Sequence, residues 1–559
     1  MKTIGIQTFI AVFALWFAIY IPFLGKIELQ GNEARRILPA MTMLETGDWI
    51  TPELADQAYY KKPPLINWLV AAAFKLRGNT AEGSARMVSA LFTLLLAMSI
   101  LFIPSGWLDS KQKTAAALIC LTSYGVIVHG RLIEIEATLT ALTGIAVIWW
   151  LGIAAGGGKS WKLWIPPAFI LGLGLLLKGP IILLFYYCTV ICVLIYMKRS
   201  RELISPAHII AILIMLAIFA VWAIKMRSLT PASETAQVAT TWKAEILDEI
   251  NPAKIGYAHW GGCIFSALFF IFPWIFLLPI LWNKKTLSEI PADKIAFFKG
   301  TTLSLAIGFA LVNIMPGTEA RYSAPLLPLA AILIGFALPL REIPMLNKTW
   351  GIVLKILNYL LISLIALSAI FIYSGRLLKI LHSIREIDRQ MLFGLEPANF
   401  ALAAVMLLIA AAISFLFVKM MKKSSDTITL ATGTAMQCAL VMIFFYILVI
   451  PLAGVFAKKK YFAREINRSV PENQMLQILD VGYQPYLYYI RDPKINIYSF
   501  SSVDDKSEYV IMTEPTYDDM MNNIRRKPEV YNGRKPVVIS TLKYKRESYK
   551  IVKMTAPLM

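Results

Sequence analysis

The strongest constraint on this chain is a series of apolar stretches, each about 20 residues long, that recurs along most of its length. A helix of about 20 apolar residues crosses the hydrocarbon of a bilayer, and it satisfies its own backbone hydrogen bonds there. The chain is 57% hydrophobic and only 16% charged, whereas a soluble chain is about a quarter charged. We therefore expect an all-α polytopic membrane protein.

Thirteen stretches fit this description, and the first of them lacks the small-residue cleavage pattern of a signal peptide. A further apolar stretch, residues 65–77, is too short to span and ends in Lys75 and Arg77. We expect it to form an amphipathic helix in the membrane interface, begun by Pro63-Pro64. The predicted spans are residues 5–25, 86–106, 114–130, 136–155, 162–177, 180–197, 206–226, 261–282, 294–314, 322–340, 349–374, 399–418 and 427–453.

Loop charge predicts the orientation of these spans. With a cytoplasmic N-terminus, the cytoplasmic loops are short and basic, as the positive-inside rule requires; an example is Lys198-Arg199-Ser200-Arg201. The opposite loops, including residues 27–82 and 227–260, carry acidic residues and mixed motifs, although the basic loop 375–398 runs against the pattern. We expect a multi-pass protein of the bacterial inner membrane whose C-terminal region is periplasmic.

The C-terminal region has an ordinary soluble composition. We expect residues 1–455 to form the membrane domain and residues 456–559 to form a small α/β domain. The segments 495–500, 509–512 and 537–540 are typical of strands, and residues 516–526 are typical of a helix that opens with Asp518 and Asp519.

Charge and cysteine content exclude two other classes. The net charge of +20 comes largely from Lys and Arg beside span ends, which favours anionic membrane lipids as partners and not nucleic acid. The cysteines lie inside apolar spans without metal-ligand spacing, so we expect small buried hydrophobes and no disulfide framework. They are Cys120, Cys188, Cys192, Cys263 and Cys438.

The ionisable residues of the outer loops form the candidate site, because charges beside a bilayer usually mark one. The chain shows no Ser-His-Asp order, Cys-His pair, nucleotide-binding glycine loop or histidine cluster. A carboxylate facing cations suits transfer from a lipid phosphate, since it accepts the proton of an attacking hydroxyl while the cations neutralise the departing phosphate. The catalytic candidates are Glu33 and Glu136, and the phosphate-binding candidates are Lys61, Lys62, Arg131, Lys178 and Arg321.

Several of these residues also have a structural interpretation. Glu136 can cap the helix that follows it, and Arg131 and Lys178 can anchor span ends at the interface. His259 and Trp49 fit an aromatic belt. Together with Asn32, these last two are the weaker candidates for substrate binding.

A series of ordered motifs runs through the first 330 residues. The motifs are Glu33-Ala34-Arg35, Thr46-Gly47-Asp48-Trp49 with Pro52, Lys62-Pro63-Pro64-Leu65 with Trp68-Leu69, Arg131-Leu132 with Glu136, Gly172-Leu173-Gly174 with Lys178-Gly179-Pro180, Pro273-Trp274, and Arg321-Tyr322 with Pro325 and Pro328. Together they resemble the GT-C polyprenyl-phosphate-sugar glycosyltransferases of the lipid A aminoarabinose transferase and protein mannosyltransferase type. The resemblance implies the GT-C fold and inverting transfer of one sugar from a polyprenyl-phosphate donor. The implied acceptor is a lipid A-like or protein hydroxyl at the periplasmic face.

This chain departs from the family pattern at three places. Asn32 stands where the family has Asp, and Glu136 stands where it usually has Asp. Lys61 replaces a glutamate that resembles a metal ligand in the family, so we expect no divalent metal and no cofactor other than the donor. Because the amide of Asn32 cannot act as a base, we expect Glu33 and Glu136 to share the role of the proton-accepting carboxylate.

Other functions stay open at this point. A transferase of the same fold can act on a growing glycan. A transporter or flippase would carry charged residues in the middle of its spans, whereas the midspan positions here are apolar. An inactive scaffold is suggested by Asn32, although the chain retains Glu33, Glu136 and the basic residues.

Overall fold

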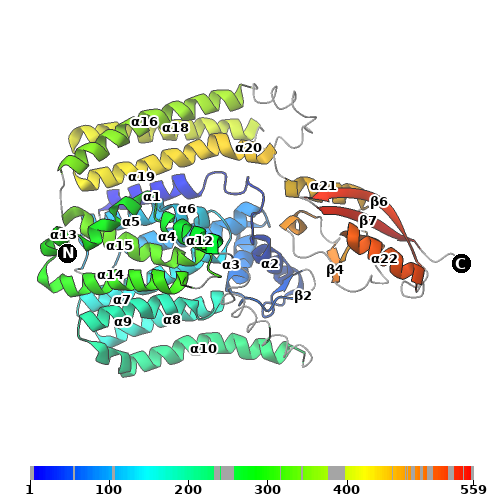
Figure 1. Ribbon diagram of the computed structural model, residues 1–559, viewed down its shortest axis with the longest axis horizontal. Coiled ribbons are helices and arrows are strands. Elements are labelled where there is room, and N and C mark those ends of the chain that lie inside the picture. Colours follow the sequence, from blue (N-terminus) through cyan, green and yellow to red (C-terminus); the bar gives the residue numbers. More distant parts are fainter. Residues whose placement is uncertain are drawn as a thin grey trace.

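The computed structural model of the chain is largely helical (Figure 1). The structure describes residues 5–54, 57–103, 107–231, 240, 257–314, 317–340, 344–374, 397–455, 458–471, 474, 476–479, 485–490, 495–499, 508–526, 534–544 and 547–555. Each of the thirteen predicted spans contains at least one helix among its described residues. The all-α membrane architecture predicted from the apolar stretches is therefore confirmed.

Within the described residues, nine helical segments are long and apolar enough to cross a membrane, and a tenth is made of two helices bent by 87°. The remaining predicted spans correspond to shorter helices. α1 and α9 have 15 and 16 residues, and α5 and α6 have 13 and 7 residues. A count of thirteen crossings stays a prediction for these shorter elements.

The helices of the membrane domain lie side by side as a bundle, with α16 and α18 along one edge and α10 along the other (Figure 1). The most enclosed elements are α7 and the segment made of η4 and α15. The bounds are α1 Ile6–Tyr20, α4 Glu82–Leu101, α5 Ser110–Thr122, α6 Tyr124–Gly130, α7 Ile135–Ala155, α8 Ser160–Lys178, α9 Ile181–Tyr196, η1 Ser200–Ile204, α10 Pro206–Leu229, α12 Tyr257–Phe269, η3 Trp274–Trp282, α13 Lys284–Glu289, α14 Ala292–Asn313, η4 Ala320–Leu326, α15 Leu327–Ala337, η5 Leu338–Leu340, α16 Pro344–Tyr373, α18 Pro397–Lys423, α19 Thr427–Phe444, η8 Phe445–Val449 and α20 Ile450–Val455.

Glycine lets two central helices approach closely. A β-carbon on Gly335 of α15 would lie 2.6 Å from the backbone nitrogen of Ala116 in α5. Helices in a membrane associate largely through such close packing of small residues, because lipid tails are as apolar as the side chains. α5 therefore packs directly against α15 in the core of the bundle.

The loop after α1 folds over one end of the bundle (Figure 1). It contains α2 (Ala34–Thr46), the short strands β1 (Glu53–Leu54) and β2 (Gln57–Ala58), and α3 (Leu65–Arg77). The helix predicted at residues 65–77 is present with those bounds, and it ends where Gly78 adopts a left-handed conformation. α3 buries Ile66, Val70 and Phe74, so its apolar face packs on the protein.

The C-terminal region lies at the same end of the bundle as this loop (Figure 1). Its sheet has the order β4-β3-β5-β7-β6, in which β3 runs parallel to β4 and β5, and β7 runs antiparallel to β5 and β6. The predicted strands and helix are present, and the structure adds α21, β3 and β7. The bounds are α21 Lys458–Ser469, β3 Leu476–Leu479, η9 Pro485–Tyr489, β4 Ile495–Ser499, β5 Tyr509–Thr513, α22 Glu514–Arg526, β6 Lys535–Tyr544 and β7 Glu547–Thr555.

Polar contacts attach the start of this region to the beginning of the chain. The Lys459 ammonium lies 3.1 Å from Glu28, and the Lys460 ammonium lies 2.8 Å from Glu82. The hydroxyl of Tyr489 accepts a hydrogen bond from the backbone N–H of Leu29 at 2.7 Å. Burial raises the pKa of Tyr489 well above its usual range, so the phenol stays protonated at neutral pH.

Candidate functional site

Three predicted site residues from separate segments meet at the end of the bundle over which the first loop folds. Glu136 lies in the first turn of α7, Lys178 is the last residue of α8, and Arg321 lies in η4. The Lys178 Nζ is 3.0 Å from the Glu136 Oε1, and the Arg321 Nε is 3.7 Å from the same oxygen. We call these three residues the ion cluster.

Helix boundaries position the members of the ion cluster. An acidic side chain is favoured in the first turn of a helix, which is where Glu136 lies. α8 ends at Lys178 because Gly179 has a φ of 71°, which glycine adopts without strain. The Lys178 Nζ also lies 4.6 Å from the centre of the Tyr322 ring, next to Arg321.

The guanidinium of Arg321 has one N–H donor that is available for a further ligand. Its Nη2 bonds Glu319 at about 2.9 Å, and Glu319 is half exposed. Its Nε is buried and has no hydrogen-bond partner among the described residues. A buried guanidinium N–H usually finds a partner, so the ion cluster is suited to an additional anion such as a phosphate.

Glu33 is held in a different arrangement. Its side chain is fully buried, and the Arg86 guanidinium donates to both of its oxygens, at 2.8 and 2.7 Å. The backbone N–H groups of Ile133 and Gln30 also donate to this carboxylate, at 2.9 and 2.7 Å. Glu33 therefore ties the first loop to α4 and to the segment before α7, and both oxygens are already hydrogen-bonded.

The guanidinium of Arg131 also makes its hydrogen bonds to groups within the protein. Its Nη1 donates to the backbone carbonyls of Ile19 and Tyr20 and to the hydroxyl of Tyr446, and its Nη2 donates to the carbonyl of Pro22. The three carbonyl acceptors belong to the end of α1 and the residues after it, and Tyr446 lies in η8. The structure thus gives Arg131 a helix-capping position and does not place it in the ion cluster.

The remaining predicted residues lie in or near the same loops. Lys61 is exposed and Lys62 is half-buried, immediately before α3. The Asn32 side-chain oxygen accepts a hydrogen bond from Arg35 at 3.1 Å, and the carbonyl of Trp49 accepts one from the indole of Trp68 at 2.6 Å. His259 of α12 is exposed, and its Nε2 lies 3.5 Å from the Cys263 sulfur.

Sequence reasoning did not single out a second buried polar pair beside the ion cluster. The Nδ1 of His129, at the end of α6, lies 3.0 Å from the Oε2 of Glu134. Both side chains are about nine-tenths buried. The available signal was the spacing, because Glu134 precedes Glu136 by two residues in the same acidic segment.

Metal binding needs several converging ligands. Among the His, Cys, Asp and Glu side chains that the structure describes, no group of three or more could hold a metal ion. Lys61, which offers an ammonium and no lone pair at neutral pH, occupies the position that the family pattern gives to a glutamate. We derive no metal-dependent step, and metal-free activity stays a prediction.

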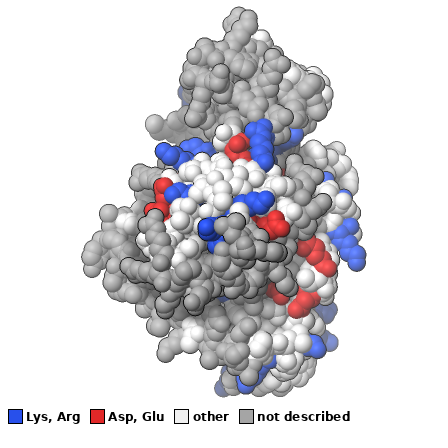
Figure 2. Space-filling model, turned by 90° about the vertical axis from the view of Figure 1, so that its right-hand side faces the viewer, with Lys and Arg blue, Asp and Glu red and all other residues white. Residues whose placement is uncertain are grey.

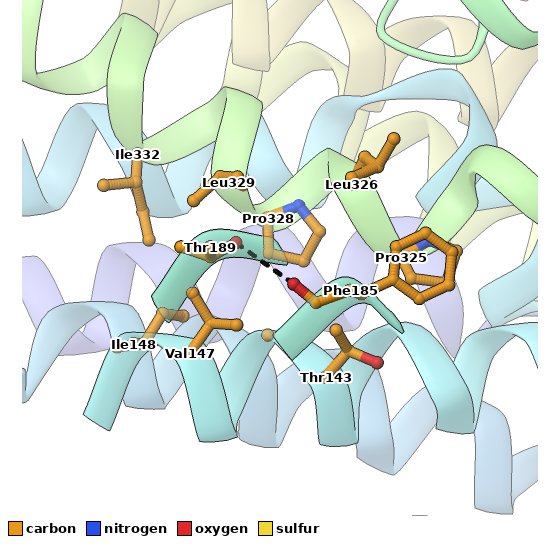
Figure 3. A pocket seen from close by; sticks show the side chains of 11 residues that line it. Thr143, Val147, Ile148, Phe185, Thr189, Pro325, Leu326, Pro328, Leu329 and Ile332 are labelled. Carbon is orange, nitrogen blue, oxygen red and sulfur yellow. Dashed lines mark hydrogen bonds between the residues drawn. The ribbon is translucent and has the colours of Figure 1, made fainter. Parts of the chain in front are cut away.

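An apolar cleft lies among helices that also carry members of the ion cluster (Figure 3). It lies between α7, α9 and the η4–α15 segment, and Thr143 and Val147 of α7 and Pro325 of η4 face it. Thr143 is seven residues, or about 10 Å of helix, from Glu136. Figure 2 shows the end of the molecule that carries the loops, where acidic and basic side chains surround uncharged surface.

Comparison with known sequences finds a matching family model and similar proteins. Residues 61–224 match the family model described as dolichyl-phosphate-mannose-protein mannosyltransferase. The chain is 24% identical over 312 residues to an undecaprenyl phosphate-alpha-4-amino-4-deoxy-L-arabinose arabinosyl transferase of Pseudomonas fluorescens, covering 55% of each chain. It is 28% identical over 225 residues to the transferase of that name from Pectobacterium atrosepticum, covering 39% of each. The alignments span about half the length of the curated relatives, or less.

Comparison with solved structures shows the fold over nearly the whole chain. The structure of ArnT from Cupriavidus metallidurans bound to undecaprenyl phosphate superposes with a TM-score of 0.66 at 15% identity, covering 98% of this chain and 97% of that one. The apo state of the same protein gives a TM-score of 0.63 with the same coverage. The chain therefore has the predicted GT-C fold, and it is similar to polyprenyl-phosphate-sugar glycosyltransferases.

Proposed function

We propose that this protein is an inverting glycosyltransferase that moves one sugar from a polyprenyl-phosphate donor to a hydroxyl acceptor at the membrane surface. The observation that carries this proposal is the convergence of Lys178 and Arg321 on Glu136, with the Arg321 Nε bonded to none of the described residues. The similarity to transferases named for undecaprenyl-phosphate-linked aminoarabinose supports the donor class.

In the proposed reaction, the acceptor oxygen attacks the anomeric carbon while the bond from that carbon to the phosphate oxygen breaks. The bonding electrons leave with the polyprenyl phosphate, and Lys178 and Arg321 neutralise the charge that develops there. Glu136 keeps both cations directed at one point. The acceptor proton passes to a carboxylate of the site.

The apolar cleft of Figure 3 supports a lipid-linked donor. Its lining is aliphatic and aromatic apart from the hydroxyls of Thr143 and Thr189, and the Thr189 hydroxyl donates to the Phe185 carbonyl within its own helix. A polyprenyl tail would lie along this apolar surface between the helices, with its phosphate at the ion cluster.

We propose the periplasmic face of the bacterial inner membrane as the place of reaction. Undecaprenyl-phosphate-linked 4-amino-4-deoxy-L-arabinose is the first donor to test, because the relatives are named for it, with lipid A as the first acceptor. Protein hydroxyls are the second acceptor class, since the matched family model is described as a protein mannosyltransferase.

The test is turnover by the purified full chain in lipid nanodiscs, with a panel of polyprenyl-phosphate sugars and both acceptors. We expect one donor to release polyprenyl phosphate and to glycosylate the acceptor. Lys178→Ala should abolish most of this turnover, whereas Lys162→Ala, at the exposed opposite end of α8, should not. A folded chain that consumes no donor would contradict the proposal, and donor movement across vesicles without consumption would indicate a flippase.

A further inference from the structure

The proposed reaction needs a proton acceptor, and the carboxylates of the site differ in their capacity for that role. Both oxygens of Glu33 are engaged by Arg86 and backbone N–H groups. Two cations face the Oε1 of Glu136 and stabilise the charged carboxylate, which makes it a weaker base. The side-chain amide of Asn32 is not a base, and its oxygen accepts a hydrogen bond from Arg35.

One carboxylate oxygen of Glu134 is available to accept a proton. Its Oε2 pairs with the Nδ1 of His129, and its Oε1 has no hydrogen-bond partner among the described residues. Although Glu134 occupies the N-cap position of α7, its side chain makes no capping hydrogen bond. A helix-capping role therefore does not account for this buried acid.

The free oxygen of Glu134 faces the first loop next to Asn32. A β-carbon on Gly31 would lie 3.5 Å from the Glu134 Oε1. Arg321 of the ion cluster lies within electrostatic range of Glu134. The oxygen thus lies beside the segment that carries Asn32.

His129 fixes the direction of this oxygen. The imidazole is buried, packs edge-on against Phe270 with ring centres 5.4 Å apart, and contacts Glu134 through Nδ1. Its Nε2 is buried without a hydrogen-bond partner among the described side chains and backbone. A carboxylate that is held through one oxygen by an imidazole presents the other oxygen in a defined direction.

We propose that Glu134 is the general base of the reaction and that His129 is its positioning residue; this inference rests on the proposed function. The Glu134 Oε1 takes the proton of the acceptor hydroxyl as the acceptor oxygen bonds to the anomeric carbon. The bond from that carbon to the phosphate oxygen breaks, and its electrons leave with the polyprenyl phosphate. The proton stays on Glu134 until the products leave.

This assignment explains how a chain with Asn32 retains a base. The resemblance to the glycosyltransferase family implies an acid at position 32, and here that position carries an amide. Glu134 reaches the same neighbourhood from the start of α7. The carboxylate that the first loop lacks is thus supplied by the segment between α6 and α7.

The first experiment measures Glu134→Gln in nanodiscs with the donor that the parent chain uses. We expect kcat to fall about 100-fold or more, as for other lost general bases, while the Kd for undecaprenyl phosphate stays within about twofold. Glu53→Gln, in β1 of the first loop, is the matched control and should retain parent activity. A Glu134→Gln variant within about threefold of the parent kcat would overturn the proposal.

The second experiment adds Asn32→Asp to Glu134→Gln. Because the Glu134 Oε1 lies beside Gly31, the residue before position 32, we expect the double variant to regain at least about tenfold in kcat over Glu134→Gln. A merely structural role for Glu134 would give no such rescue, and a double variant no faster than the single one would overturn the assignment. If Glu134→Gln does not fold, Glu134→Asp should fold and show a reduced kcat with unchanged undecaprenyl phosphate binding.

His129 is tested with His129→Asn and His129→Ala. The Asn side chain places a donor near the position of the imidazole Nδ1, so it should retain more kcat than Ala, with equal undecaprenyl phosphate binding in both. Equal kcat for the two variants would contradict the positioning role. A parent chain that consumes no donor would overturn the proposed function itself, whereas an active parent with an active Glu134→Gln would overturn only the assignment of Glu134.

Discussion

Glu33 and Arg86 form a fully enclosed ion pair, with side chains that are 0% and 2% exposed. The sequence pattern predicts Glu33 as a proton acceptor, but four hydrogen bonds occupy its oxygens. Breaking a buried pair leaves a charge without compensation, which costs about 3–5 kcal/mol. At this site, geometry favours a structural role for the acid.

We therefore expect Glu33→Gln to destabilise the folded protein by about 3–5 kcal/mol, measured as a lower midpoint of unfolding in detergent. Glu465→Gln removes the partner of the exposed Arg468 and should change stability by less than about 1 kcal/mol. A Glu33→Gln variant with the parent midpoint and no transfer would instead make Glu33 the base, and would count against Glu134.

Lys61 leads to a prediction about metal dependence. An ammonium in place of a carboxylate repels a divalent ion and attracts the donor phosphate. We expect turnover to survive chelator treatment. Lys61→Ala should weaken donor binding most strongly at low ionic strength, where screening is least, and Lys198→Ala at the far end of α9 serves as the control. Loss of turnover on chelation, restored by zinc or magnesium, would refute this prediction.

The residue types of the site were easier to predict than their roles. Glu136, Lys178 and Arg321 come from distant segments. The topology predicted from loop charge puts all three on one face of the membrane, and in the structure they meet. Arg131 was assigned to phosphate, yet it bonds carbonyls at the end of α1. Whether a guanidinium faces a carbonyl or an anion depends on tertiary packing, which a loop sequence does not encode locally.

At the scale of elements, hydropathy predicted where the helices lie but not how they break. The predicted span 114–130 is two helices on either side of Ser123, and the predicted span 261–282 bends by 87°. In the C-terminal domain, α21 is strongly charged, yet it buries Phe462 and Ile466. Short apolar faces of this kind become visible only when the partner surface is known.

The contact between α5 and α15 gives a stability prediction. Because a β-carbon on Gly335 would lie 2.6 Å from the Ala116 nitrogen, Gly335→Ala must push the helices apart, at a cost of about 1–3 kcal/mol. Gly262→Ala, in α12, meets no atom of the described residues within 4 Å and should be neutral or stabilising by up to about 1 kcal/mol. Equal unfolding midpoints for the two variants would show that α5 and α15 are not packed this closely.

The whole molecule places its first loop and its C-terminal domain at the same end (Figure 1). Thr46 and Asp519 are exposed at that end, and Ser200 is exposed in η1, which follows α9. With the protein in its native orientation in the membrane, Thr46→Cys and Asp519→Cys should react with an impermeant thiol reagent added from the periplasm. Ser200→Cys should not react. The parent chain is the control for labelling of the native cysteines. Labelling of Ser200→Cys, or of only one of the other two, would refute the predicted topology.

The hydrogen bond between Leu29 and Tyr489 joins residues that are 460 positions apart. A ribosome adding about 5–20 residues per second needs about 20–90 s to make the intervening chain. During that interval the loop that carries Glu33 has no C-terminal partner, while the helices it will cover are still entering the membrane. Chains released before α21 would therefore leave Glu28, Leu29 and Glu82 without these contacts, which makes synthesis of α21 and η9 a checkpoint for assembly of the first loop.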